Sequence, residues 1–293
     1  MILPKTLIKS RINEVSDQSG IDSLEHALDK DHFINYPYKI EYKFNSRGFR
    51  DFEWPTSINE LQKSIWCIGD SFTSGVGVPF EHTWPQVLKK MSLRNVINVS
   101  LDGASNSWIS RQTGYILEEI HPEIIIIQWS YINRRERSEE ELTEKAWDFF
   151  YNAIKDPSWP TDIKFNNFKT LLLPEQIKDI ESDPFYHKFK DELDYDSEGR
   201  IDFVKCSLQE DLDCFRLCVN NLSNPKKTKI IHTFIPYWHL TTLDESLKLY
   251  DTFNWHNQTV IKEIKTLDYG RDHHHYDRIT AEKLCGEIIQ ALV

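Results

Sequence analysis

The sequence is poor in several features that would place it in a specialised class of protein. It contains five cysteines, an odd and scattered number that favours reduced thiols over a disulfide framework. It has no apolar run of about 18 residues, so we expect no membrane span. Residues 1–20 hold neither a long apolar core nor a small-residue cleavage site, so we expect a cytoplasmic protein without a signal peptide.

Positive charge is also scarce. The chain has 35 lysines and arginines against 46 aspartates and glutamates, which gives a formal net charge of −11. An acidic surface repels phosphate backbones, so nucleic acid is not an expected partner. Hydrophobic residues make up 40% of the chain and aromatic residues 13%, a globular composition. At 293 residues the chain can form one large α/β domain with insertions, and its composition does not decide an oligomeric state.

Short apolar segments alternate with segments of helical spacing from residue 63 onwards. Candidate strands lie at 64–70, 95–100, 122–130 and 228–236, with a weaker fifth at 261–269. Candidate helices lie at 81–91, 105–120, 207–222 and 277–293. Strands and helices that alternate through short connections form parallel sheets covered by helices on both faces. The pattern therefore predicts a parallel α/β fold.

The remaining segments interrupt this alternation. Residues 1–60 form an irregular lead-in that we expect to pack on the core, and residues 61–293 form the α/β domain. Within that domain, residues 134–205 are polar, acidic and aromatic and lack the strand–helix rhythm. We interpret them as a helical or irregular insertion, and we find neither an internal repeat nor a low-complexity tract.

The segment "WCIGDSFTSGVG", residues 66–77, places glycines and serines after the first candidate strand. Glycines in this position can cradle a phosphate, but no lysine follows them as a P-loop requires. Gly75 and Gly77 also lack the third glycine of a dinucleotide fingerprint, because position 80 is Phe. The alternative is that Ser71 is held at the carboxyl end of the strand, where ligands bind in parallel sheets.

A serine nucleophile needs a base, and the base needs a group that orients it. The segment "GRDHHHYD" supplies both types of residue just before the last candidate helix, as Asp272 and His275. A Gly–Asp–Ser tripeptide alone has little meaning, since it also occurs by chance. Its combination with "NVSLDG" after the second strand and with Asp272-x-x-His275 is more specific.

These blocks resemble those of the SGNH, or GDSL, hydrolase family, over about residues 45–293 without the insertion. "NSRGFR", residues 45–50, resembles a segment that precedes the core in some members. The resemblance implies a three-layer α/β/α, flavodoxin-like fold and esterase chemistry. It implies Ser71 as nucleophile, His275 as general base and then acid, and Asp272 as the residue that orients His275. His274 is the alternative to His275 if the loop is shifted.

The resemblance also implies an oxyanion hole built from the backbone amides of Ser71 and Gly103 and from an asparagine after the third strand. The chain departs from the family pattern there, because the family asparagine falls on Ile132 and Asn133 follows one residue later. Asn133 is our predicted third donor; the alternatives are Ser130, Gln128 or Tyr131, or the absence of a third donor. Other candidates for substrate binding flank these blocks, namely Asp70, Asn106, Ser130 and Arg134.

Each candidate also has a purely structural interpretation. Ser71 is a suitable helix cap, Gly103 a turn glycine, and Asn106 the start of a helix. The run His273–His275 invites a metal site, but adjacent side chains point in different directions and no second ligand pair stands out. We therefore predict no metal and no cofactor.

The predicted function is hydrolysis of a small carboxylic ester through an acyl-serine intermediate, possibly on an O-acetylated carbohydrate. Two alternatives remain open on the sequence: an O-acyltransferase with the same triad, and a ligand-binding module that has lost catalysis. A metal-dependent hydrolase using the histidine run is a weaker alternative.

Overall fold

The computed structural model describes residues 3–19, 22–132, 134, 208–222, 228–236, 252–256, 258–262 and 264–292. The chain divides into two compact units, Met1–Ile132 with Asp213–Val293, and Asn133–Leu212. The fold described below is that of the first unit. Apart from Arg134, the predicted insertion at 134–205 lies outside the described residues.

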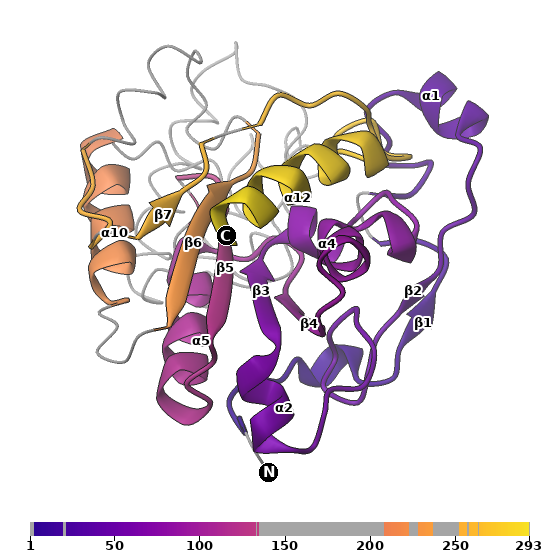
Figure 1. The fold of residues 1–293 in the computed structure, drawn as a ribbon. Coiled ribbons are helices and arrows are strands. Elements are labelled where there is room, and N and C mark those ends of the chain that lie inside the picture. Colours follow the sequence, from indigo (N-terminus) through magenta and orange to yellow (C-terminus); the bar gives the residue numbers. More distant parts are fainter. Residues whose placement is uncertain are drawn as a thin grey trace, which may run out of the picture. The chain divides into compact units, whose positions relative to one another are not determined.

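A five-stranded parallel sheet forms the centre of the first unit (Figure 1). Its spatial order is β4-β3-β5-β6-β7, which in chain order is the 2-1-3-4-5 arrangement of flavodoxin-like folds. Every residue of β3, β4 and β5 is buried, as expected for a sheet covered on both faces. The strands are β3 (Ile65–Gly69), β4 (Val96–Ser100), β5 (Ile124–Trp129), β6 (Lys229–Phe234) and β7 (Thr259–Val260).

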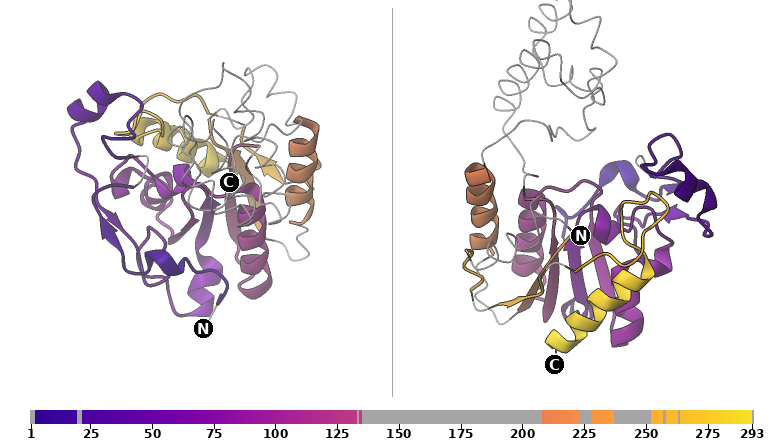
Figure 2. Two further views of the ribbon diagram at one scale, coloured as in Figure 1. Left: turned by 180° about the vertical axis from the view of Figure 1, so that it is seen from behind. Right: turned by 90° about the horizontal axis from the view of Figure 1, so that it is seen from above.

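Helices cover both faces of this sheet (Figure 2). Helix α4 (Trp84–Ser92) leads from β3 to β4, and α5 (Asn106–Glu119) leads back from β4 to β5, so right-handed crossovers place them on opposite faces. Helix α12 (Arg278–Leu292) packs against α4. Helix α10 (Leu208–Asn220) contacts α5, since Ser110 Oγ of α5 donates a 2.8 Å hydrogen bond to the Cys218 carbonyl of α10. The predicted three-layer α/β/α fold is confirmed.

The lead-in contains a small antiparallel sheet of β1 (Val15–Ser16) and β2 (Tyr42–Lys43). Around β2 the side chains of Ile40, Tyr42 and Phe44 alternate inward and form a buried cluster. Short helical segments complete this part of the chain and the turns that follow it: η1 (Lys9–Arg11), α1 (Lys30–Asn35), α2 (Ile58–Lys63), α3 (Ser71–Ser74) and η2 (Phe80–His82).

The prediction of a fifth strand at 261–269 was wrong in position. The strand is β7, two residues long, which pairs with β6 through Thr259 and Val260 just before the predicted range. Ile261 adds one hydrogen bond, from its backbone N–H to the His232 carbonyl at 2.8 Å. The β-branched residues are therefore the ones that pair, and beyond them only an isolated bridge of Tyr269 with Tyr276 occurs.

Two further expectations concern the membrane and the cysteines. Within the described ranges, no helix combines the length and the apolar character that crossing a membrane requires. Four cysteines lie in the part of the chain that the structure describes, and all are free thiols, three of them buried: Cys67, Cys214, Cys218 and Cys285.

Candidate active site

Ser71 is placed at the carboxyl end of the sheet by a sharp strand-to-helix transition. Strand β3 ends at Gly69, and α3 begins at Ser71. Asp70 caps α3, since its side chain accepts a 3.0 Å hydrogen bond from the Phe72 backbone N–H. Strand β3 lies between β4 and β5, whose connections run in opposite directions. This is the topological switch point at which open α/β sheets bind ligands.

The structure brings Ser71, His275 and Asp272 together. Ser71 Oγ donates to His275 Nε2 at 2.8 Å, and His275 Nδ1 donates to Asp272 Oδ2 at 2.5 Å. The three residues are 3%, 1% and 1% exposed, respectively. This is the serine–base–carboxylate arrangement in which the carboxylate holds the imidazole in one tautomer and the imidazole can take the serine proton.

Burial and charge act in opposite directions on the His275–Asp272 pair. Burial alone would lower the pKa of His275, but the Asp272 charge and hydrogen bond raise it above its usual value, with smaller contributions from Asp102 and Asp70. Burial alone would likewise raise the pKa of Asp272, but His275 and the backbone amides of His274 and His275 hold it below its usual value. Asp272 is therefore ionised and suited to stabilise an imidazolium.

The loop that carries Asp272 packs on Gly77. Arg271 N–H donates to the Gly77 carbonyl at 2.6 Å, and Gly270 N–H donates to the His275 carbonyl at 2.7 Å. Gly77 has a φ of +78°, and a Cβ at this position would lie 2.6 Å from Asp272 Oδ1. Gly77 thus allows both the turn and the close approach of the carboxylate. Sequence reasoning considered Gly77 only as a possible phosphate-binding glycine and missed this role.

The three successive histidines have different surroundings. His275 is the one beside Ser71, whereas His274 Nε2 lies 3.3 Å from the Tyr131 hydroxyl. His273 Nδ1 lies 3.1 Å from Asp29 Oδ2, and its ring stacks on His32. Among the described residues there is no group of three His, Cys, Asp or Glu side chains suited to a metal ion.

Two backbone N–H groups near Ser71 are available to a ligand. Those of Ser71 and Gly103 have no hydrogen-bond partner among the described residues. Gly103 lies in the turn after β4 with a φ of +69°, and this turn is joined to β3 by the hydrogen bond from Leu101 N–H to the Gly69 carbonyl, at 3.2 Å. The predicted third donor, Asn133, lies outside the described residues.

The polar candidates around Ser71 bind one another. Ser130 Oγ donates to Asp70 Oδ2 at 2.6 Å, and Asn106 Oδ1 accepts from Ser130 N–H at 3.0 Å. Asn106 Nδ2 donates to the carbonyls of Ser130 and Tyr131. These side chains therefore tie the loop after β5 to Asp70 and α5. Arg134 is half-buried and belongs to the second unit, so its predicted role stays a prediction.

Gln128, an alternative oxyanion donor, is committed to the core. Its Nε2 donates to the Tyr276 hydroxyl at 2.8 Å. Its Oε1 accepts from Thr73 Oγ1 at 2.9 Å and from Trp84 Nε1 at 3.0 Å. Both ends of the amide are thus engaged, and Gln128 is fully buried.

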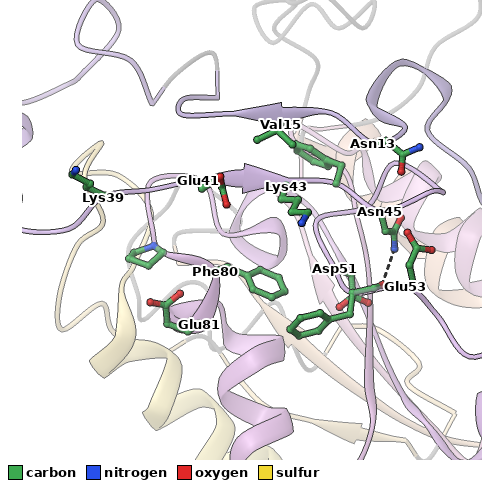
Figure 3. A pocket seen from close by; sticks show the side chains of 13 residues that line it. Asn13, Val15, Lys39, Glu41, Lys43, Asn45, Asp51, Glu53, Phe80 and Glu81 are labelled. Carbon is green, nitrogen blue, oxygen red and sulfur yellow. Dashed lines mark hydrogen bonds between the residues drawn. The ribbon is translucent and has the colours of Figure 1, made fainter.

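A cavity of about 560 Å³ lies beside the lead-in rather than at Ser71 (Figure 3). Charged residues line it together with aromatic rings, among them Lys43, Glu81, Phe52 and Phe80. Asp51 lines its buried end, and burial raises the pKa of Asp51 to about 7. None of the triad residues lines this cavity, so we do not assign the reaction to it.

The sequence matches no protein-family model and no curated protein. Similarity to solved structures is detectable at low sequence identity. A protein of the G-D-S-L lipolytic family from Desulfitobacterium hafniense is 15% identical, with 79% of this chain and 99% of that chain covered and a TM-score of 0.34. TesA is 9% identical, with 78% and 98% covered and a TM-score of 0.42.

A family two carbohydrate esterase from Clostridium thermocellum, solved with cellohexaose, is 11% identical. The match covers 82% of this chain and 67% of that chain, with a TM-score of 0.42. Since identities and TM-scores are all low, we rest no functional inference on these likenesses.

Proposed function

We propose that this protein is a serine ester hydrolase of the SGNH type, with Ser71 as nucleophile, His275 as general base and Asp272 as orienting carboxylate. The observation that carries the proposal is the continuous hydrogen-bonded series Ser71 Oγ–His275 Nε2 and His275 Nδ1–Asp272 Oδ2, buried at the carboxyl end of a parallel sheet. A serine hydroxyl is a weak nucleophile by itself, and this series supplies the base and its orientation.

Acylation begins when Ser71 Oγ attacks the ester carbonyl carbon while its proton passes to His275 Nε2. The carbonyl oxygen becomes an oxyanion, to which the free N–H groups of Ser71 and Gly103 are suited donors. When the C–O bond to the alcohol breaks, His275 returns the proton to the leaving oxygen. The products of this half-reaction are the free alcohol and an acyl-Ser71 ester.

Deacylation repeats these steps with water in place of Ser71. His275 takes a proton from the water, whose oxygen attacks the acyl carbon, and then protonates Ser71 Oγ as the acyl bond breaks. The acid is released and Ser71 is regenerated. Asp272 keeps its charge throughout, which fits its lowered pKa.

The preferred substrate class is a small carboxylic ester, such as an acetyl group on a carbohydrate hydroxyl. The acidic composition of the chain, with a formal net charge of −11, supports a small polar substrate over a long lipid chain.

Reaction of Ser71 with a fluorophosphonate probe tests the proposal. Wild-type protein should be labelled at Ser71, and labelling should be absent in Ser71→Ala and at least about 100-fold slower in His275→Ala. Gly114→Ala in α5, where an added Cβ meets no atom within 4 Å, serves as the control. Failure of well-folded wild-type protein to react would refute the proposal and favour a non-catalytic binding module.

A further inference from the structure

The lead-in contacts both loops that carry the proposed catalytic groups. Ser19 Oγ donates to Asp102 Oδ2 at 3.1 Å, and Asp102 precedes Gly103 in the turn after β4. Asp22 contacts Arg271, which precedes Asp272 in the other loop. Ser19 is therefore bonded to the turn that carries Gly103, and Asp22 to the loop that carries Asp272.

Asp22 is bonded to two other parts of the chain, at Tyr42 and at Arg271. It is fully buried, and its carboxylate accepts from Arg271 Nε at 2.9 Å and from Arg271 Nη2 at 2.7 Å. The Tyr42 hydroxyl donates to the same carboxylate at 2.5 Å. A two-pronged, charge-assisted contact of this kind fixes the guanidinium in direction as well as in distance.

Tyr42 extends the contact from Asp22 to Gly77. Its hydroxyl oxygen accepts a 2.8 Å hydrogen bond from Gly77 N–H while its proton goes to Asp22. The Gly77 carbonyl in turn accepts from Arg271 N–H at 2.6 Å. Asp22, Tyr42, Gly77 and Arg271 thus form a closed ring of contacts, and Asp272 lies directly against Gly77.

Arg50 also holds the turn that contains Gly77, by hydrogen bonds to its backbone carbonyls. It is buried, and its guanidinium donates to the carbonyls of Ser74 and Val78, at 3.2 and 2.9 Å, as well as to that of Gly75. The guanidinium lies over the Tyr42 ring, 4.3 Å from its centroid. The lead-in therefore holds the backbone on which Asp272 packs through several independent contacts.

We propose that Asp22 and Tyr42 are positioning residues for the triad, which set the place of Asp272 through Arg271 and Gly77. The inference rests on the proposed ester hydrolysis but adds residues about 250 positions away from Asp272 in the sequence. Without Asp22 or the Tyr42 hydroxyl, the turn at Gly77 and the loop at Arg271 lose their common partner, and Asp272 is no longer held against His275 Nδ1. Small displacements of catalytic groups have large effects on rate.

Asp22 is charged and Tyr42 is neutral, so their substitutions should affect the pH profile of activity differently. A general loss of stability would not produce this difference. Tyr42→Phe keeps the ring over Arg50 and the Asp22–Arg271 ion pair, and removes the hydroxyl that links Asp22 to Gly77 N–H. Asp22→Asn leaves the Arg271 cation without its counter-charge, one residue from Asp272. Loss of the Asp22 negative charge leaves this loop more positive, and a more positive surrounding disfavours the imidazolium of His275, whose pKa Asp272, Asp102 and Asp70 raise.

The experiment measures hydrolysis of p-nitrophenyl acetate by full-length variants between pH 5 and pH 9. We expect Tyr42→Phe to lower kcat roughly tenfold, with KM and the midpoint of the acidic limb unchanged. Asp22→Asn should lower kcat similarly and move the midpoint of the limb down by about half a pH unit. In the double variant Asp22→Asn, Arg271→Gln the midpoint should return towards the wild-type value.

Tyr36→Phe is the matched control. The Tyr36 hydroxyl also joins the lead-in to a carboxylate near α12, donating to Asp277 Oδ2 at 3.0 Å, but among the described residues it makes no hydrogen bond to Gly77 or Arg271. It should keep the wild-type kcat, and thermal melting of all variants identifies any that fail to fold. If Asp22→Asn does not fold, Tyr42→Phe alone decides the question.

The outcomes distinguish the two proposals. Wild-type protein that neither hydrolyses the ester nor labels at Ser71 refutes the proposed function. An active wild type whose folded Tyr42→Phe variant retains full kcat refutes the positioning role alone. So does an Asp22→Asn variant whose loss of activity only follows its folded fraction, with an unchanged pH profile.

Discussion

The close approach of Gly77 to Asp272 leads to a sharp prediction for Gly77→Ala. The added methyl group would stand 2.6 Å from Asp272 Oδ1 and 2.9 Å from its Cγ, at a residue whose φ is +78°. Asp272 cannot simply rotate away, because it accepts hydrogen bonds from the backbone amides of His274 and His275 and from His275 Nδ1. The carboxylate and its loop must therefore move together.

The magnitude follows from two contributions. An L-residue in the left-handed region costs about 1–2 kcal/mol, which should appear as a loss of stability. Relief of the overlap requires a shift of roughly half an ångström, and a misplacement of about 1 Å can cost about 100-fold in rate. We therefore expect kcat/KM to fall roughly 10- to 100-fold, far more than the loss of folded protein explains.

Hydrolysis of p-nitrophenyl acetate and thermal melting, measured on the same preparation, test this reasoning. The control is Gly114→Ala in α5, where an added Cβ meets no atom within 4 Å. It should keep full activity and gain about 0.5–1 kcal/mol of stability, since alanine is the better helix former. If folded Gly77→Ala hydrolysed the ester at the wild-type rate, Asp272 would not depend on this approach.

Three further predictions concern charge and burial. Burial lowers the pKa of His275, but the charge and hydrogen bond of Asp272 outweigh burial and raise it above its usual value. Wild-type activity, which needs the neutral imidazole, should therefore rise with pH through a midpoint above 6.5. Asp272→Asn should move that midpoint to lower pH and reduce kcat roughly 10⁴-fold, and an unmoved limb would contradict the assignment. Burial raises the pKa of Asp51 from 3.8 to about 7, so the folded state keeps a proton that the unfolded state releases, and stability falls as pH rises through this window. The stability of Asp51→Asn relative to wild type, from urea unfolding, should therefore rise between about pH 4 and pH 7, whereas a constant difference would refute the prediction. Arg50→Lys should cost about 2–4 kcal/mol in the same assay, because an ammonium cannot reach the separate carbonyls of Ser74, Gly75 and Val78, and a loss below about 1 kcal/mol would show that the guanidinium fork is dispensable.

Much of the fold could be predicted from local pattern. The run "IIIIQW" is apolar on both faces and became β5, the buried strand beside β3. The helical spacing before Glu119 became α5, capped by Ser105 as expected for a serine at that position. The fifth strand was misplaced because only two residues pair there, and so short a segment carries little periodicity.

The candidate triad could also be proposed from the sequence, because its chemistry needs particular residue types at strand ends. The Asp272-x-x-His275 block favoured His275 as the proposed base, but spacing alone left His274 as an alternative. The structure brings His275 to Ser71, while His274 lies beside Tyr131 and His273 lies beside Asp29. The direction of each side chain depends on the path of the loop, which packs on Gly77.

By itself, then, the sequence determined the order of strands and helices and the residue types at the carboxyl end of the sheet. Both depend on local properties, namely hydrophobic periodicity and the chemistry of short motifs. Only the tertiary structure decided that Asp22 and Tyr42 would support the loop of Asp272, because their contacts join residues far apart in the chain. Such contacts form only when separate segments are packed together, and no local sequence pattern predicts them.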